Sequence, residues 1–296
     1  MAMSDQAPAT DAGRLEASVR YLAGDIGERN VRRPAALAAA ADYIEARWQA
    51  QGYDVTRQWY EAAGLRCANL EVTRSGRQRG GEILLIGAHY DTVPGSPGAD
   101  DNASGVAALI EIAGLFTSIL PSMTVRFVAF TNEEPPFYMG EEQGSIVYAR
   151  AARARGDDIR LMVSLEMLGF YRDTPRSQNY PPLFRWFYPD RGNFLGFVGN
   201  LRSRAVMLKA ARCFRAGSDF PLEHVATLAL VPGVSWSDHR SFWLQGYRAF
   251  MATDTAFYRN PHYHTARDRP NTLAYPEFAR ATQGLYRCFA AVASKT

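Results

Sequence analysis

Runs of consecutive apolar residues alternate along this chain with amphipathic stretches, which predicts strands and helices in turn. The segments 82–89 (EILLIGAH), 124–131 (TVRFVAFT) and 161–168 (LMVSLEML) are apolar at most positions. Such runs are typical of strands that are covered on both faces of a sheet. Further strand-like runs lie at 66–73, 194–199 and 247–256. A helical period is predicted instead for 33–52, 104–120, 145–155, 202–216 and 275–294.

Strands that alternate with helices predict an α/β fold with helices on both faces of the sheet. The sequence contains no internal repeat and no long linker. We therefore expect a flexible N-terminal tail over residues 1–12 and a single domain over residues 13–296. Loops rich in Pro, Gly and aromatic residues are expected to form the walls of a substrate pocket. They lie at 95–101, 134–145, 171–193 and 231–240.

Composition excludes several classes of protein. A formal charge of +3 over 296 residues, with scattered Lys and Arg, does not indicate a nucleic-acid or membrane-surface partner. No apolar stretch reaches the roughly 18 residues that a transmembrane helix needs. The N-terminal segment lacks the basic and apolar regions of a signal peptide, so we expect a cytoplasmic protein, with secretion still open for a trimmed chain.

The strand at 82–89 ends in His89, and Asp91 follows two positions later. On an extended chain the two side chains lie on the same side. An aspartate that accepts the second ring N–H is a common partner of a metal-bound histidine. A Gly/Pro-rich loop then leads to Asp100 and Asp101. Helix capping explains one of these aspartates but does not require two.

Three further segments place carboxylates or a histidine beside predicted strand ends. Glu133 and Glu134 follow the strand at 124–131, and consecutive residues on a strand point in opposite directions. One can therefore bind a metal while its neighbour faces a water molecule as a general base. Glu166 lies among apolar residues, where a charge is costly unless it is paired or metal-bound. Since ligands bind beyond the carboxyl ends of strands in open α/β sheets, we expect these groups and His264 to meet at one rim.

This set of donor groups predicts a centre for two divalent metal ions. Two histidines and three carboxylates, one of them bridging, can hold two ions about 3.5–4 Å apart. Imidazole and carboxylate ligands without thiolate favour zinc, with manganese or cobalt as substitutes. The three cysteines have no paired spacing, so they indicate neither a disulfide framework nor a thiolate site.

A serine-based mechanism is the main competing hypothesis that the sequence offers. Ser237, Asp238 and His239 are adjacent, but a nucleophile, a base and an orienting group must converge from separate segments. The chain also lacks a G-x-S-x-G motif. We therefore expect this segment, with Asp238 and the neighbouring Trp236, to line the substrate pocket.

Five motifs occur in order: GAHYDTVPGSPGADDNASGVAAL, FTNEE, SLEMLG, SDHRSFW and YHTARDRPNTL. Together they resemble the dinuclear zinc aminopeptidases, a group of zinc exopeptidases that also includes glutaminyl cyclases and glutamate carboxypeptidases. The resemblance runs from residue 65 to the C-terminus. It implies a single α/β domain around a central mixed, mostly parallel sheet of about eight strands with helices on both faces.

The resemblance also implies a role for each candidate residue. Glu133 is then the general base, and Asp91 supports the imidazole of His89. Either Tyr263 or Tyr258 stabilises the oxyanion, and the sequence leaves this choice open. Two further residues lie outside the ligand set. Asp100 is then a loop or capping residue, and Asp268 supports a ligand. The implied ligands of the two zinc ions are His89, Asp101, Glu134, Glu166 and His264. Among these, Asp101 is implied to bridge both ions.

One segment departs from the pattern of the group. Residues 135–145 (PPFYMGEEQGS) are longer and more aromatic than the corresponding joint in many relatives, so we expect Phe137 and Tyr138 to shape the pocket. The same segment contains a second acidic pair, Glu141 and Glu142, which competes for the catalytic role. Because this pair precedes a predicted helix, helix capping and the helix dipole also explain it.

The expected activity is hydrolysis of a peptide bond next to a free N-terminus by a zinc metallopeptidase with two ions per chain. The aromatic loops suit an apolar first side chain. Competing hypotheses are a glutaminyl cyclase or a carboxypeptidase of the same fold, and a non-catalytic binding domain. The expected partner is a peptide substrate with a free N-terminus.

Overall fold

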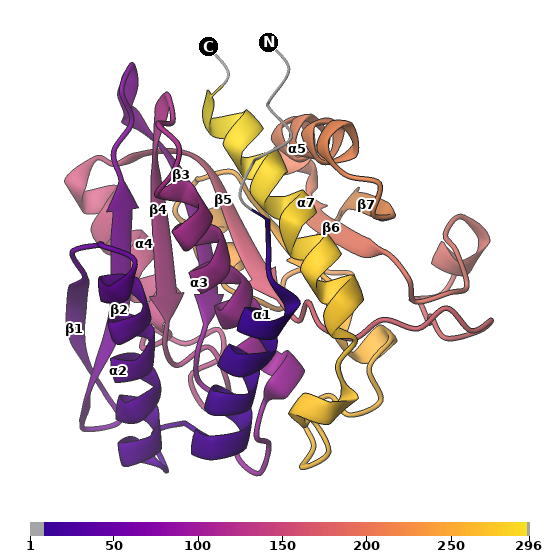
Figure 1. Ribbon diagram of the computed structural model, residues 1–296, viewed down its shortest axis with the longest axis horizontal. Coiled ribbons are helices and arrows are strands. Elements are labelled where there is room, and N and C mark those ends of the chain that lie inside the picture. The colour runs from indigo at the N-terminus through magenta and orange to yellow at the C-terminus, as the bar shows by residue number, and fades with distance from the viewer. Residues whose placement is uncertain (1–8, 295–296) are drawn as a thin grey trace.

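A mixed β-sheet runs through the whole molecule (Figure 1). The structure is a computed structural model that describes residues 9–294. Its strands are β1 (Thr56–Ala62), β2 (Leu65–Arg74), β3 (Arg79–His89), β4 (Met123–Phe130), β5 (Asp158–Glu166), β6 (Leu195–Asn200), β7 (Leu222–Thr227) and β8 (Ala249–Thr253). The α-helices of these residues are α1 (Ala12–Val19), α2 (Pro34–Ala50), α3 (Gly105–Phe116), α4 (Gly144–Arg155), α5 (Arg204–Gly217), α6 (His239–Leu244) and α7 (Tyr275–Ser294).

Four neighbouring strands, in the order β4-β3-β5-β8, run parallel and form the centre of the sheet. The complete order is β1-β2-β4-β3-β5-β8-β6-β7. β2 pairs antiparallel with β4, and β6 pairs antiparallel with β8, so the sheet becomes mixed towards both edges. Because the four central strands share one direction, their carboxyl ends meet at one edge of the molecule, the lower edge in Figure 1.

Helices cover both faces of the sheet, which explains the uninterrupted apolar runs. Leu84 and Ile86 of β3 belong to a core shared with α1, α2, α3, α5 and α7, whereas Ile83 and Leu85 belong to a second core with α4 and α6. Figure 1 shows α1, α2, α3 and α7 in front of the sheet and α4 behind it. Burial of one such side chain contributes about 1.5–3 kcal/mol. The predicted α/β fold is therefore confirmed.

Some elements lie where the hydrophobic pattern gave no signal. β1 and β7 are the edge strands, and most residues of β1 are exposed or half-buried, so it contains no apolar run. Helix α1 begins at Ala12, where the carboxylate of Asp11 accepts a hydrogen bond from the backbone N–H of Gly13 at 2.7 Å. Residues 1–8 of the expected tail lie outside the described part of the chain. None of the helices between residues 9 and 294 is long and apolar enough to cross a membrane.

Candidate metal centre

The carboxyl ends of the central strands bring the five predicted ligands together. His89 is the last residue of β3 and Glu166 is the last residue of β5. Glu134 lies just beyond β4, Asp101 lies in the turn before α3, and His264 lies in the loop after β8. His264 is partly exposed, and the remaining four are buried. Segments that are far apart in the sequence therefore meet at one rim, as the strand directions require.

The five side chains form two groups that share Asp101. In the first group, Nε2 of His89 lies 3.3 Å from Oδ1 of Asp101 and 3.5 Å from Oε2 of Glu166. In the second, Nε2 of His264 lies 3.1 Å from Oδ2 of Asp101 and 3.3 Å from Oε1 of Glu134. The donor atoms of each group lie within 4.8 Å of one another. Nitrogen and oxygen donors of this kind suit zinc, and the two groups share one carboxylate.

Burial and mutual charge determine how these groups hold protons. Burial alone would lower the pKa of His89, but the charge of Glu166 and a hydrogen bond with Asp101 raise it well above its usual value. Burial opposes the charge on His264 too, yet hydrogen bonds with Asp101 and Glu134 raise its pKa to about 10. Burial and the charge of Asp101 raise the pKa of Glu134 to about 7. Metal binding must displace these protons, so affinity for metal will rise with pH.

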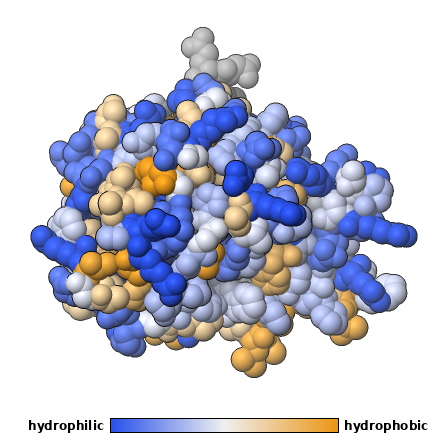
Figure 2. Space-filling view, turned by 90° about the horizontal axis from the view of Figure 1, so that it is seen from below, coloured by the Kyte–Doolittle hydropathy of each residue, from blue (hydrophilic) through white to orange (hydrophobic). Residues whose placement is uncertain are grey.

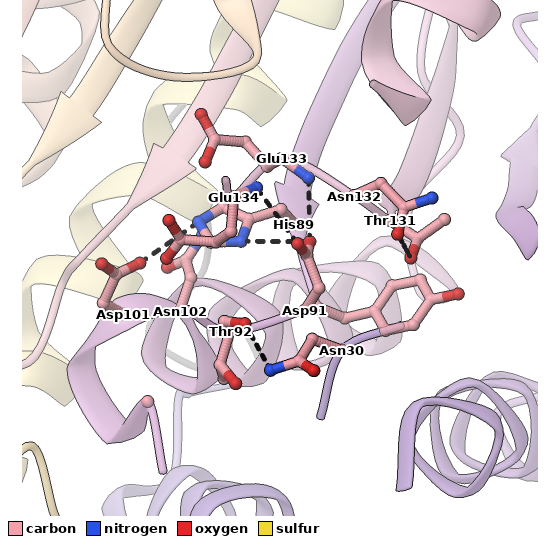
Figure 3. A network of polar contacts seen from close by, with 12 residues as sticks. Asn30, His89, Asp91, Thr92, Asp101, Asn102, Thr131, Asn132, Glu133 and Glu134 are labelled. Carbon is pink, nitrogen blue, oxygen red and sulfur yellow. Dashed lines mark hydrogen bonds and ion pairs between the residues drawn. The ribbon is translucent and has the colours of Figure 1, made fainter. Parts of the chain in front are cut away.

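Asp91 connects three parts of the centre (Figure 3). Its Oδ1 lies 3.5 Å from Nδ1 of His89 and accepts a hydrogen bond from the backbone N–H of Glu133 at 3.1 Å. Its Oδ2 accepts a hydrogen bond from the backbone N–H of Glu134, also at 3.1 Å. The sequence predicted only the contact with the histidine. One buried carboxylate thus contacts the ring of a candidate ligand and fixes the backbone of both glutamates relative to it.

Asp268 supports Asp101 in a similar way. Its two oxygens accept hydrogen bonds from the backbone N–H groups of Asp100 and Asp101, at 2.9 and 3.0 Å. Asp100 does more than the expected loop or capping role. Its buried carboxylate accepts hydrogen bonds from Gly169 N at 2.9 Å and from Asn260 Nδ2 at 2.7 Å. Asp100 therefore ties the ligand-bearing loop to the segments that follow β5 and β8.

Glu133 lies beside the two ligand groups and belongs to neither of them. It is buried, and burial and the charge of Glu134 raise its pKa well above its usual value, although the charge of a nearby histidine opposes the shift. The second acidic pair lies on the surface instead, where Glu141 forms an ion pair with Arg150 and Glu142 is exposed. The strand-end pair is therefore the one that adjoins the centre.

A cavity adjoins the ligand groups. Glu166 and Tyr263 contribute to its lining. Two of the four expected wall segments, 171–193 and 231–240, enclose it, whereas no residue of 95–101 or 134–145 lines it. Its lining is mostly apolar and includes the aromatic residues Tyr180, Phe184, Phe194, Phe197, Trp236 and Phe257. Figure 2 views the molecule from the edge where the central strands end and shows a mostly polar surface with separate apolar patches. The lining of the cavity, in contrast, is mostly apolar.

Three residues expected in the pocket lie outside this cavity. Phe137 packs in the main core, and the hydroxyl of Tyr138 is buried, which raises its pKa. Asp238 is fully buried at the start of α6, where burial raises its pKa to about 7. Its neighbour Ser237 donates a hydrogen bond to Oε2 of Glu166 at 2.7 Å. Ser237 therefore supports a ligand from behind, and of residues 236–239 only Trp236 lines the cavity as expected.

The two candidate tyrosines both line the cavity but differ in what surrounds their hydroxyl groups. Tyr258 donates a hydrogen bond to the carbonyl of Pro232 at 3.3 Å. Tyr263 stacks on His264, with 3.7 Å between the ring centroids. Burial and then the charge of Asp101 raise the pKa of Tyr263. Its hydroxyl therefore lies in the field of the ligand carboxylates.

Arg29 is a buried residue of this region that the sequence did not reveal. Its side chain is fully buried and donates hydrogen bonds to the backbone carbonyls of Leu22, Gly27, Tyr90, Pro97 and Gly98, at 2.7 to 3.2 Å. Tyr90 precedes Asp91, and Gly98 lies three residues before Asp101. One cation therefore fixes both ends of the loop that carries these aspartates. A lone arginine in a polar segment gives no sign of such a role.

Comparison with known proteins identifies the family. The family model described as "Peptidase family M28" matches residues 69–288. The chain is 36% identical over 281 residues to the uncharacterized protein YfbL of Escherichia coli, covering 92% of this chain and 85% of the relative. It is 25% identical over 220 residues to leucine aminopeptidase 1 of Fusarium vanettenii, covering 68% of this chain but only 50% of the relative.

Solved structures agree on the fold. The zinc aminopeptidase BSAP from Bacillus subtilis superposes with a TM-score of 0.75 at 15% identity, covering 98% of this chain and 97% of that one. A glutaminyl cyclase from Bacteroides thetaiotaomicron superposes with a TM-score of 0.70 at 20% identity, covering 95% and 98%. The matched family model spans most of the chain, including all five candidate ligands, and so the protein belongs to peptidase family M28.

Proposed function

We propose that this protein is a zinc aminopeptidase that removes single residues from the free N-terminus of peptides with two metal ions. The observation that carries the proposal is the pair of ligand groups that share Asp101, with Glu133 beside both. The family membership supports a peptidase, and the names of several relatives and structural neighbours support an aminopeptidase.

The chain supplies the proton transfers of this reaction. Zinc ions held by these ligands would activate a water molecule and polarise the scissile carbonyl. The carboxylate of Glu133 takes the proton of the attacking water and passes it to the leaving amine. The backbone N–H of Glu133 donates a hydrogen bond to Oδ1 of Asp91 at 3.1 Å. This bond fixes the backbone from which the carboxylate extends beside both ligand groups. The raised pKa of Glu133 in the buried site suits a group that must hold a proton between the two steps.

Tyr263 is the better candidate for stabilising the oxyanion. Its hydroxyl lies near the ligand carboxylates, whereas that of Tyr258 is engaged by the carbonyl of Pro232. We expect Tyr263→Phe to lower kcat by about 10²-fold, the range seen when one oxyanion donor is removed. Tyr258→Phe is the matched control, and an equal loss in both variants would contradict the assignment.

The cavity supports a large apolar side chain at the N-terminal position of the substrate. Its walls are mostly apolar and contain several aromatic side chains, and it adjoins Glu166 at the centre. Among the described residues that line it there is no Lys or Arg. A carboxypeptidase needs a cation to hold the terminal carboxylate of its substrate, so this lining favours an aminopeptidase.

A glutaminyl cyclase and a non-catalytic binding domain would each need a different set of residues at the centre. A glutaminyl cyclase uses one metal, whereas two groups of donor atoms are present here. A binding domain has no need for a buried carboxylate beside the ligands, yet Glu133 occupies that place. The paired donor groups and this carboxylate therefore favour a two-metal hydrolase.

The test is a substrate panel assayed with zinc-loaded and chelator-treated protein. The panel contains Leu-p-nitroanilide, N-acetyl-Leu-p-nitroanilide, a peptide with N-terminal Gln, and an N-blocked dipeptide with a free carboxylate. We expect zinc-dependent cleavage of the first compound alone. Cyclisation of the Gln peptide would indicate a glutaminyl cyclase instead, and cleavage of the N-blocked dipeptide would indicate a carboxypeptidase. No turnover of any compound by protein with two bound zinc ions would favour a binding domain.

A further inference from the structure

The cavity wall formed by residues 171–193 rests against one buried cation, Arg259. This residue is only 5% exposed and lies in the segment between β8 and His264. Its Nε donates a hydrogen bond to Oε1 of Gln178 at 2.8 Å, and its Nη1 donates to the carbonyl of Phe170 at 3.4 Å. The guanidinium also lies 4.6 Å from the ring centroid of Phe194, which lines the cavity. Hydrogen bonds and a ring contact thus join this arginine to Gln178 of the wall and to Phe170 and Phe194, which flank the wall in the sequence.

Gln178 transmits this contact to the cavity. Its side chain is buried, accepts the hydrogen bond from Arg259 and contributes to the cavity lining, whereas Arg259 itself does not. Nε2 of Gln178 donates to Oγ1 of Thr255 at 2.8 Å, and the backbone N–H of Asn179 donates to the carbonyl of Tyr258 at 2.8 Å. The wall is therefore fastened at 178–179 to the segment that follows β8.

Gly192 shows how closely the far end of the wall approaches the arginine. A Cβ atom at this position would lie 2.8 Å from both Cδ and Nε of Arg259. The carbonyl of Gly192 accepts a hydrogen bond from the backbone N–H of Arg172 at 2.8 Å, and its own N–H donates to Oγ of Ser177 at 2.9 Å. The two ends of the loop are thus bound to each other directly over the arginine stem. An added methyl group there must displace one of them.

We propose that Arg259 is a positioning residue that sets the selectivity of the enzyme for large apolar N-terminal side chains. It does so by holding the 171–193 wall in place through Gln178. This inference rests on the proposed function, because it takes the cavity as the site of the first substrate side chain. A wall that shifts outward loses contact with a large side chain, whereas an alanine side chain is too short to depend on the wall. Selectivity in apolar pockets responds steeply to such contacts, by roughly 10- to 200-fold for a single methylene group.

Two variants disturb this clamp, the contact of Arg259 with the 171–193 wall, by different routes. Arg259→Met removes the hydrogen bonds and the charge but keeps an unbranched side chain, and Gly192→Ala keeps the arginine but crowds its stem. The matched control is Arg185→Met, which removes an exposed arginine of the same loop. All proteins are compared for zinc content and for kcat and KM on Phe-, Leu- and Ala-p-nitroanilide.

We expect kcat/KM for the Phe substrate to fall about tenfold in both clamp variants, mainly through KM, with the Ala substrate changed less than about threefold. The control and the zinc content should match the wild type. A parallel loss on Phe and Ala substrates would contradict the proposal, because it would place the effect at the metal centre or in the fold. Unchanged selectivity in both clamp variants would overturn it as well.

Hydrogen exchange of the backbone amides at 178–179 and 192 provides a readout that needs no turnover. We expect faster exchange there in both clamp variants and no change in the control. If the zinc-loaded wild type cleaves no aminoacyl substrate, the proposed function fails, and the exchange rates alone decide whether Arg259 holds the wall. Wild-type exchange rates in both clamp variants would refute the clamp whatever the activity.

Discussion

Asp91→Asn tests whether one carboxylate organises the whole centre. The substitution keeps the shape of the side chain but replaces one acceptor oxygen with an NH₂ donor. In the native structure, both oxygens accept backbone hydrogen bonds, from Glu133 and Glu134, each at 3.1 Å. The asparagine oxygen can keep one of these bonds, while the NH₂ group must face the second N–H. Asp91→Asn therefore leaves one buried donor without a partner and removes the negative charge beside His89.

The size of the effect follows from these contacts. A hydrogen bond to a charged group contributes about 1.5–3 kcal/mol, and a buried donor without a partner costs about 1–3 kcal/mol. We expect the free energy of unfolding of the metal-free protein to fall by about 3 kcal/mol. Loss of a residue that supports a metal ligand typically weakens metal affinity by about 10- to 100-fold, and we expect zinc affinity to fall within that range.

Urea unfolding of chelator-treated protein measures the first quantity, and competition with a chromogenic zinc chelator measures the second. Asp158→Asn is the matched control, because Asp158 is exposed and its contact with Arg160 at 3.5 Å is a surface ion pair. Such pairs contribute about 1 kcal/mol or less. If Asp91→Asn changed stability no more than the control and left zinc affinity intact, the organising role of Asp91 would be refuted.

Three further predictions concern the same centre. Glu133→Gln should keep its zinc and lose about 10²- to 10⁴-fold in kcat, the contribution of a general base, and near-native turnover by the zinc-loaded variant would exclude this role. Arg29→Met should lower the free energy of unfolding by at least about 3 kcal/mol, since several buried carbonyls lose their donor, and a urea midpoint equal to that of the wild type would contradict this. The raised pKa values of His264, about 10, and Glu134, about 7, mean that the folded metal-free protein binds more protons than the unfolded chain. Its stability should therefore decrease from pH 6 to pH 9, whereas zinc affinity should increase over the same range; stability that rises with pH would refute the assigned protonation.

The sequence predicted where two of the candidate ligands lie, because the positions of these two depend on strand direction. His89 and Glu166 end strands that read as buried apolar runs, and parallel strands end at one edge of a sheet. The His-x-Asp spacing also predicted that Asp91 approaches His89, because alternate residues of an extended chain share a side. Local periodicity and one rule of topology were enough for these residues.

The supporting residues could not be predicted in this way. Arg29 binds backbone carbonyls of distant segments, and the sequence does not reveal which buried carbonyls need a donor. The supporting role of Asp268 was expected only from the resemblance to the family. Asp238 was expected to face the substrate, but it is buried at the start of α6, a helix of six residues that the pattern did not reveal. The edge strand β1 was missed for a related reason, since it is paired on one side only and needs no apolar run.

The central claim is that two zinc ions, joined by Asp101, act together on a substrate with a free N-terminus. A titration of chelator-treated protein with zinc tests it most directly, with bound zinc measured by mass spectrometry and activity measured on Leu-p-nitroanilide. We predict that activity reaches its maximum only as bound zinc approaches two ions per chain. Full activity with one ion or fewer per chain would contradict the two-metal account.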